Sequence, residues 1–157
     1  MSSRGKHDIS SNRFLYAGIH LIEDLVALSR LKMPRAPKVE RSSVEIAGLG
    51  VEFDGFTICQ ITDVHHGRVI GTKFLHQVVE TANALSPDLT VLTGDYVDKD
   101  ASYLGSAVKT LSGLKARHGL LCVLGNHDHF YDKQYTADLL NRHNIPLLDN
   151  SHAIIER

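Results

Sequence analysis

Three short and mostly apolar runs of the sequence each end in a cluster of polar residues. The runs cover residues 56–62, 89–93 and 120–124. Runs of this length that stop at turn-forming residues are typical of buried strands in a parallel sheet. The polar clusters that follow them read Asp63-Val64-His65-His66-Gly67, Gly94-Asp95-Tyr96-Val97-Asp98 and Gly125-Asn126-His127-Asp128-His129.

The spacing of these clusters predicts consecutive β-α-β units. Asp95 follows Asp63 by 32 residues, and Asn126 follows Asp95 by 31 residues. A β-α-β unit takes about 30 residues or more. Because the carboxyl ends of parallel strands meet at one edge of a sheet, we expect the three clusters to lie together at the edge where α/β proteins build their sites.

Segments with the periodicity of amphipathic helices separate the predicted strands. Apolar residues recur three and four positions apart over residues 72–85, 102–117 and 133–143. Pro87, Gly119 and Asn144 lie just after these segments and end the predicted helices. The predicted fold class is therefore α/β, built from β-α-β layers.

Two hairpins are predicted at the ends of this region. The first joins residues 44–47 to residues 51–53 through a Gly-Leu-Gly turn. The second joins Leu147-Leu148 to residues 153–155 through an Asp-Asn turn. Each hairpin would add two short strands to the sheet.

Residues 14–31 carry a further amphipathic pattern. Leu15, Ile19 and Ile22 recur at helical spacing, and Pro34 follows the predicted helix. The segment is too short and too charged to span a bilayer, which takes about 20 mostly apolar residues. It also lacks the small-residue cleavage site of a secretory signal. Two interpretations stay open: packing against a protein surface, or peripheral contact with a membrane interface.

Composition narrows the class of protein. A chain of 157 residues with 43% hydrophobic and 22% charged residues suits one globular domain. The net charge of −1 offers no basic surface for nucleic acid. Cys59 and Cys122 lie inside predicted strands, which favours small core residues over a disulfide framework or a zinc knuckle.

The polar clusters offer a ligand set for divalent metal ions. Asp63, His65, Asp95 and Asn126 combine carboxylate, imidazole and amide donors without a thiolate. Such a set favours Mn, Fe, Zn or Co at a reactive centre over a structural zinc site. Asp95 follows the middle strand, between the other donors, and so suits bridging two ions. Two cations about 3.5–4 Å apart clamp a phosphoryl group for in-line displacement.

Three motifs, in this order and spacing, resemble the signature of calcineurin-like metallophosphoesterases. The motifs are Asp63-x-His65, Gly94-Asp95-x-x-Asp98 and Gly125-Asn126-His127-Asp128. The surrounding sequence is similar to a bacterial, often membrane-associated branch that includes phosphodiesterases and UDP-2,3-diacylglucosamine hydrolases. The resemblance covers residues 43–157 and implies one half of a metallophosphoesterase α/β sandwich, preceded by the N-terminal amphipathic helix.

The resemblance also implies a role for each matching residue. Asp63 and His65 would bind a first metal ion, Asp95 would bridge two ions, and Asn126 would bind the second. The implied cofactors are two divalent ions, with Mn favoured and Fe, Zn or Co as alternatives. The implied reaction is hydrolysis of a phosphodiester, phosphomonoester or pyrophosphate bond by a metal-bound hydroxide at this dinuclear centre.

Two further residues receive catalytic roles from the same resemblance. His127 would protonate the leaving oxygen or stabilise the phosphoryl charge, and Asp98 would orient His127. A leaving alkoxide needs a proton, which makes a positioned imidazolium a suitable general acid.

The family's domain continues into a second half, where further histidines, including a Gly-His-x-His motif, complete both metal sites. Residues 1–157 contain no such motif, and His143 and His152 occur in other contexts. We therefore expect this chain to correspond to the N-terminal half and to need a missing C-terminal half or a complementing chain for turnover. The alternative is an inactive half-domain that binds metal or phosphate weakly or serves assembly.

Domain organisation and location follow from these interpretations. Residues 1–42 are expected to form a polar N-terminus, the amphipathic helix and a linker, and residues 43–157 the phosphoesterase part. A doubly wound nucleotide-binding domain is disfavoured, because no G-x-G-x-x-G follows the first predicted strand. We expect a phosphate-ester substrate, no nucleic-acid partner and a cytoplasmic location, peripheral at the inner membrane if residues 14–31 form an anchor.

Overall fold

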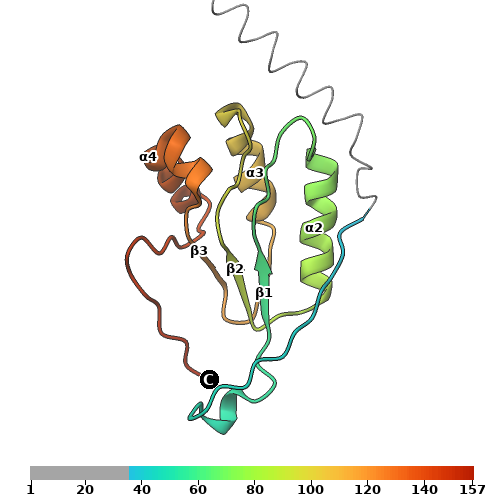
Figure 1. Ribbon diagram of the computed structural model, residues 1–157, viewed down its shortest axis with the longest axis vertical. Coiled ribbons are helices and arrows are strands. Elements are labelled where there is room, and N and C mark those ends of the chain that lie inside the picture. The colour runs from blue at the N-terminus through green and yellow to red at the C-terminus, as the bar shows by residue number, and fades with distance from the viewer. Residues whose placement is uncertain (1–35) are drawn as a thin grey trace, which may run out of the picture. The chain divides into compact units, whose positions relative to one another are not determined.

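A computed structural model describes residues 36–157 (Figure 1). Its centre is a parallel sheet of three strands in the order β1-β2-β3: β1 is Ile58–Ile61, β2 is Leu89–Leu92 and β3 is Leu120–Cys122. The register pairs Gln60 with Val91 and Val91 with Leu121. These strands occupy the three predicted apolar runs, and the predicted α/β class is confirmed.

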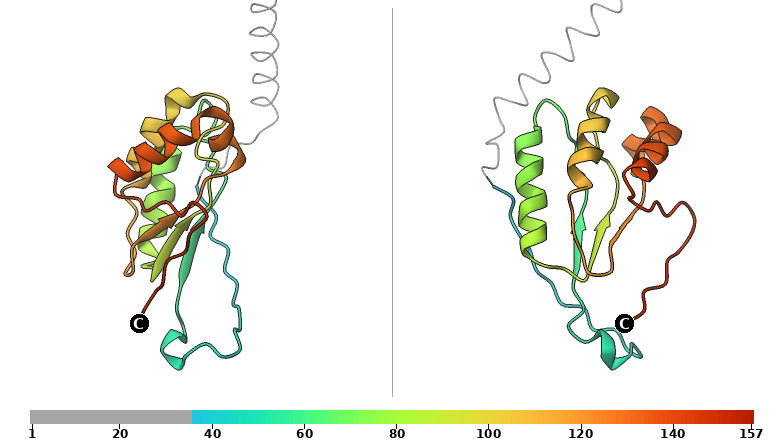
Figure 2. Two further views of the ribbon diagram at one scale, coloured as in Figure 1. Left: turned by 90° about the vertical axis from the view of Figure 1, so that its left-hand side faces the viewer. Right: turned by 180° about the vertical axis from the view of Figure 1, so that it is seen from behind.

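Within residues 36–157, three α-helices accompany the sheet. Helix α2 covers Thr72–Ala84 and α3 covers Leu104–Leu111, directly after a 3-10 turn at Ala101–Tyr103. Helix α4 covers Asn126–Arg142. Seen from the side, α2 and α3 lie on the same side of the sheet (Figure 2). The predicted segment 14–31 lies outside the described residues, and no helix within residues 36–157 is long and apolar enough to cross a membrane.

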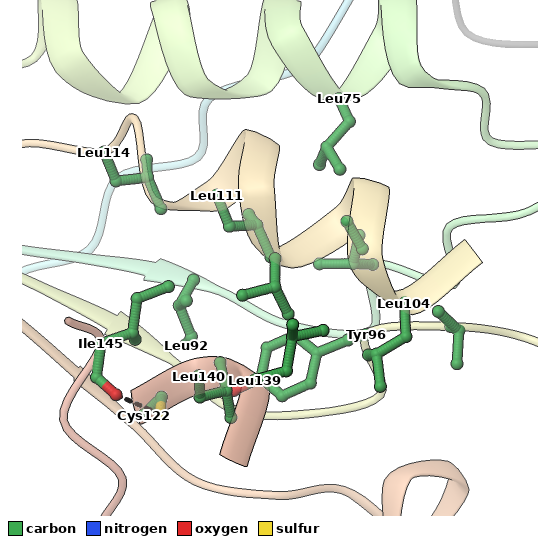
Figure 3. Packing of buried hydrophobic residues seen from close by; sticks show 14 of the residues in the cluster. Leu75, Leu92, Tyr96, Leu104, Leu111, Leu114, Cys122, Leu139, Leu140 and Ile145 are labelled. Carbon is green, nitrogen blue, oxygen red and sulfur yellow. Dashed lines mark hydrogen bonds between the residues drawn. The ribbon is translucent and has the colours of Figure 1, made fainter. Parts of the chain in front are cut away.

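The core lies between the sheet and the helices (Figure 3). The residues of the strands that face it include Leu92 and Cys122, each 1% exposed. Leu75 from α2 and Leu111 from α3 belong to the same core, and Leu140 from α4 lies near Cys122 of β3. Burying a side chain of this size stabilises the fold by about 1.5–3 kcal/mol relative to leaving it exposed. Each helix buries one apolar face, and the residues on that face recur about every 3.6 positions. This burial explains why the periodicity of the helices is visible in the sequence.

Helix α3 is shorter than predicted because a side chain of α2 holds the chain that follows it. The side-chain amide of Asn83 donates to the carbonyl of Gly113 at 2.9 Å, and its oxygen accepts from the backbone amide of Lys115 at 2.7 Å. These bonds satisfy backbone groups that a longer helix would have paired internally. The prediction of helix up to residue 117 is wrong, since α3 ends at Leu111.

Helix α4 begins earlier than predicted and contains a kink. The backbone of Asp132 is extended, with φ −168° and ψ 93°, and its carboxylate accepts from the amide of Tyr135 at 2.9 Å. Asp132 therefore caps a second helical segment, which matches the predicted helix closely. The segment before the kink starts at Asn126, seven residues before the predicted start at residue 133.

Neither predicted hairpin forms, and both predictions are wrong. Val51–Phe53 is a 3-10 turn, and Val44, Ile46 and Val51 are 79%, 61% and 86% exposed. At the other end Leu147 pairs in parallel with Cys122, and residues 151–157 have no regular secondary structure. A hairpin is at best marginal unless its apolar face is buried, and these side chains have no apolar surface of the described chain to cover them.

A buried carboxylate joins the amino ends of β1 and β2. Oδ2 of Asp88 accepts from the amide of Thr57 at 2.8 Å and from its hydroxyl at 2.9 Å. Arg117 forms an ion pair with the other oxygen. The hydrogen bonds from Thr57 hold the pKa of Asp88 below its usual value, with Arg117 adding attraction.

We expect Asp88→Asn to lower the free energy of unfolding at neutral pH and to make little difference in acid. A carboxyl group whose pKa falls on folding stabilises the fold above its unfolded pKa, about 3.9, and this contribution disappears as the pH falls through the lower folded value. Urea unfolding of both proteins at neutral pH and at a series of values below about pH 4 measures how this difference declines. The exposed Asp138→Asn serves as the control, and a difference that persists unchanged in acid would contradict the assignment.

Candidate metal centre

The three polar clusters meet at the carboxyl edge of the sheet. The loop after β1 continues to pair with the loop after β2: the amide of Asp63 donates to Gly94 O at 3.2 Å and the amide of His65 to Asp95 O at 2.9 Å. The third cluster opens α4 directly after β3. The arrangement expected from parallel strands is therefore present, because the loops leave the same edge side by side (Figure 1).

Several residues of these loops adopt a left-handed backbone. Asp63 has φ 50°, His65 φ 43° and Asp95 φ 55°. Non-glycine residues rarely adopt this conformation, although Asp and His do so more often than most, and it costs of order 1–3 kcal/mol per residue. Strain of this kind persists only where the surroundings hold it, and it concentrates at functional sites.

Imidazole and carboxylate groups converge above these loops. Nε2 of His65 lies 3.6 Å from Oδ1 of Asp63 and 3.8 Å from Oδ2 of Asp95. The rings of His65 and His127 meet edge to face, with centroids 4.8 Å apart. One donor atom each from His65, Asp95 and His127 lies within 4.8 Å of the others. A single cation fits among donor atoms at this separation.

The two carboxylate oxygens of Asp95 have different neighbours. Oδ1 accepts from the backbone amide of His127 at 2.9 Å, whereas Oδ2 points to His65. Asp95 is 8% exposed, so its charge lies largely out of bulk water. Asn126, the other predicted ligand from this region, is the exposed first residue of α4 and immediately precedes His127.

Asp98 contacts His127 through its backbone. The Nδ1–H group of His127 donates to the carbonyl oxygen of Asp98 at 2.7 Å. The carboxylate of Asp98 instead lies 3.9 Å from Nδ1 of His65. The structure therefore joins Asp98 to both imidazoles and places its carboxylate beside His65.

Two glycines allow the loops after β2 and β3 to touch. A Cβ atom on Gly94 would lie 2.0 Å from the amide nitrogen of Gly125, and one on Gly125 would lie 2.0 Å from Oδ1 of Asp95. Gly94 also has φ 91°, which disfavours any side chain. The contact between these backbones brings Asp95 and the start of α4 together.

Asp128 is a residue of the site to which the sequence analysis assigned no role. Its side chain is fully buried and accepts hydrogen bonds from the amides of Asp95 at 2.8 Å, Gly125 at 2.9 Å and Tyr96 at 3.1 Å. Burial raises the pKa of Asp128, with the charge of Asp95 adding to the effect, although the three amides oppose it. An acidic residue three positions after Gly125 is also the pattern of a helix capping box, which could have revealed both Asp128 and the start of α4.

His66 occupies the core and takes no part in the cluster. It is 1% exposed, Nδ1 lies 2.7 Å from the carbonyl oxygen of Ile70, and Nε2 lies 2.8 Å from the hydroxyl of Ser106. Both ring nitrogens therefore have partners. His66 is therefore a core residue with its hydrogen bonds satisfied, and not a member of the cluster of candidate ligands.

Comparison with known proteins identifies the family. The sequence model of the calcineurin-like phosphoesterase family matches residues 56–153. The chain belongs to this family. The matched segment of this phosphoesterase chain contains the three strands and every predicted site residue.

Several relatives carry related names. A zebrafish "Transmembrane protein with metallophosphoesterase domain" is 34% identical over 77% of this chain and 28% of its own length. UDP-2,3-diacylglucosamine pyrophosphatase LpxG of Chlamydia muridarum is 33% identical over 70% of the chain and 30% of its own length. The uncharacterized metallophosphoesterase YkuE of Bacillus subtilis is 40% identical over 49% of the chain and 28% of its own length. The chain thus spans less than a third of these relatives, and no solved structure matches it.

The donor set of this phosphoesterase chain fits divalent metal ions. Oxygen and imidazole donors without a thiolate suit Mn, Fe, Zn or Co. Nδ1 of His65 is buried and has no hydrogen-bond partner among residues 36–157, and a buried polar atom without a partner calls for an explanation such as an ion. Three carboxylates, of Asp63, Asp95 and Asp98, surround that ring within 4 Å. A cation would offset their mutual repulsion.

Proposed function

We propose that this protein hydrolyses a phosphate ester with the help of two divalent metal ions, of which Mn²⁺ is the favoured candidate. The observation that carries the proposal is the convergence of donor atoms from His65, Asp95 and His127 within 4.8 Å at the carboxyl edge of the sheet. The membership of the chain in the calcineurin-like phosphoesterase family supports the reaction class.

Asp95 is assigned as the ligand shared by both ions. Its neighbours support this: Asp63 and His65 lie on the side of Oδ2 and would hold one ion, while Asn126 begins the helix whose next amide donates to Oδ1. The ions would supply charge stabilisation for the phosphoryl group and lower the pKa of the attacking water. The loop contacts of the chain keep these donors in place before substrate arrives.

His127 is assigned as the group that protonates the leaving oxygen. With its Nδ1–H committed to the carbonyl of Asp98, Nε2 is the nitrogen left to carry the transferred proton. Tyr131 packs near the same ring, with centroids 6.3 Å apart, and burial together with the charges of Asp98 and Asp100 raises the pKa of its hydroxyl. Tyr131 therefore stays protonated at neutral pH and adds no charge to the site.

The active unit is proposed to include further polypeptide on the second face of the sheet. Parallel sheets are normally covered on both faces, yet Ile58 of β1 is 60% exposed and Val123 after β3 is 37% exposed. A second half of the domain or a complementing chain would bury this face and add ligands. Substrates include the pyrophosphate class, because one relative is named a pyrophosphatase.

We expect hydrolysis of bis-p-nitrophenyl phosphate that depends on Mn²⁺ and is lost on chelation. His127→Asn should lower the rate about 100-fold or more, since a positioned general acid contributes about 10²–10⁴-fold. His129→Asn, in the same turn of α4 but exposed, is the matched control. The assay uses the longest polypeptide that the gene encodes around residues 1–157, with residues 1–157 alone beside it.

Each result of this assay has a distinct meaning. Activity that survives exhaustive chelation would contradict the metal mechanism. Equal rates in the His127 and His129 variants would contradict the proton donor. Binding of Mn²⁺ without turnover in every form of the protein would instead favour the alternative of a metal-binding module.

A further inference from the structure

The carboxylate of Asp128 fixes the backbone on both sides of Asp95. It accepts from the amide of Asp95 itself and from the amide of the next residue, Tyr96. These two N–H groups belong to the two peptide planes that flank the α-carbon of Asp95. Holding both planes sets φ and ψ of that residue and so sets the direction in which its side chain leaves the backbone.

The same carboxylate ties Asp95 to the helix that carries His127. Oδ2 of Asp128 is shared between the amides of Asp95 and Gly125, the residue before α4. The amide of His127 in turn donates to Oδ1 of Asp95. The hydrogen bonds form a closed ring from the loop after β2 to the first turn of α4 and back, so neither side can shift alone.

This closed set of hydrogen bonds holds the backbone of Asp95 in a conformation that would not persist by itself. Asp95 has a left-handed backbone with φ 55°, which costs of order 1–3 kcal/mol for a residue with a side chain. Tyr96 adds a second link between the loops after β2 and β3. Its hydroxyl donates to the carbonyl of Val123 at 2.8 Å, and its side chain is fully buried. Asp128 is nevertheless the group that contacts Asp95 directly.

Joining these two loops through a buried negative charge costs free energy. Asp128 is buried and accepts a hydrogen bond from the amide of Asp95, whose own carboxylate is a second buried negative charge, so a neutral side chain would suit the fold without metal better. The negative charge of Asp128 becomes favourable when cations occupy the site. A carboxylate that does not touch the metal can orient the ligands and attract the ions. The position of the Asp128 carboxylate, buried behind Asp95, therefore supports metal binding at this site.

We propose that Asp128 is a positioning residue that presets the carboxylate of Asp95 for metal binding. This inference rests on the proposed function, in which Asp95 is the ligand shared by the ions. Asp128 touches neither substrate nor metal in this proposal, and acts through the two peptide planes of Asp95.

The first experiment measures Mn²⁺ binding by calorimetry on residues 1–157, well below the unfolding temperature. Asp128→Asn keeps the shape but turns an NH₂ donor toward one of the three amides, and we expect about tenfold weaker binding. Asp128→Ala removes all three bonds, and we expect about 100-fold weaker binding. The control is Asp132→Asn, which makes the same charge change in the same helix at an exposed cap.

A purely structural role for Asp128 would lower the melting temperature and leave the Mn²⁺ affinity of the folded protein unchanged. Wild-type affinity in Asp128→Asn would therefore overturn the inference. Asp128→Asn retains one acceptor oxygen and keeps the test valid if Asp128→Ala fails to fold.

The second experiment needs no metal and separates this inference from the proposed function. We expect the amides of Asp95, Tyr96 and Gly125 to exchange with deuterium faster in metal-free Asp128→Asn than in the wild type, with exchange of the β2 amides unchanged. Unchanged exchange at Asp95 and Tyr96 would overturn the inference whether or not the wild type binds Mn²⁺. Failure of the wild type to bind any divalent ion would instead contradict the proposed function.

Discussion

Asp95→Asn is expected to lower the affinity for Mn²⁺ by about 100-fold or more, the largest loss of any single ligand change. Removing a group that only orients a ligand costs about 10–100-fold, and Asp95 is assigned as a ligand of two ions at once. In the wild type the backbone amide of His127 donates to Oδ1 of Asp95 at 2.9 Å, and asparagine retains a side-chain oxygen that accepts the same bond, so the loops stay joined. Calorimetric titration of residues 1–157 measures the change.

The same variant is expected to fold as well as the wild type when metal is absent. The charge of Asp95 raises the pKa of Asp128, which shows that the two carboxylates repel each other. Removing one charge relieves that repulsion, so the loss of metal binding should come without loss of stability. The shift of melting temperature on adding Mn²⁺ should shrink, because ligand stabilisation follows affinity.

Asp100→Asn is the matched control for this prediction. Asp100 is exposed, lies in the same loop and caps the turn at Ala101–Tyr103, outside the cluster of candidate ligands. We expect wild-type Mn²⁺ affinity in this variant. Similar losses in the Asp95 and Asp100 variants would mean that general charge attracts the ion, and the bridging assignment would then be wrong.

Gly94→Ala is expected to destabilise the fold by about 2–5 kcal/mol. The left-handed backbone of this residue, with φ 91°, adds about 1–2 kcal/mol for a residue with a Cβ atom. The new methyl group would lie 2.0 Å from the amide nitrogen and 2.6 Å from the α-carbon of Gly125, and overpacking of this kind costs about 1–3 kcal/mol. The clash is with backbone, so no side chain can move aside.

Urea unfolding gives the measurement, and Gly105→Ala gives the contrast. A Cβ atom on Gly105 meets nothing within 4 Å, and the residue lies inside α3. Alanine there should stabilise the protein by about 0.5–1 kcal/mol, because glycine loses more conformational freedom in a helix. Equal stability of Gly94→Ala and the wild type would show that the loops after β2 and β3 do not require this close contact.

The sequence predicted the three strands and the edge of the sheet at which the candidate metal ligands lie. Apolar runs about 30 residues apart could only be parallel strands joined by helices, and parallel strands deliver the residues after them to one edge. His65 and Asp95 were therefore predicted to meet, although they are 30 positions apart. Helical periodicity also located α2 correctly, because the residues on the buried face of a helix recur about every 3.6 positions.

Other features depended on whether a neighbouring surface exists. Val44 and Ile46 alternate with other residues as in a strand, and Val51 begins the second strand of the predicted hairpin, but nothing in the described chain covers these side chains and no strand forms. Asn83 ends α3 early through two hydrogen bonds to a segment about 30 residues away. Local pattern contains no information on either event, since both depend on which segments pack together.

What the sequence alone determined is which side chains are candidate metal ligands and which edge of the sheet presents them, because strand spacing and strand direction are local properties of the chain. Only the tertiary structure decided how those side chains are held. The backbone carbonyl of Asp98, and not its carboxylate, accepts from His127, and the buried Asp128 fastens both peptide planes of Asp95. Such contacts join residues about 30 positions apart through backbone atoms that every residue shares, so they follow from strand register and from the contact of Gly94 with Gly125.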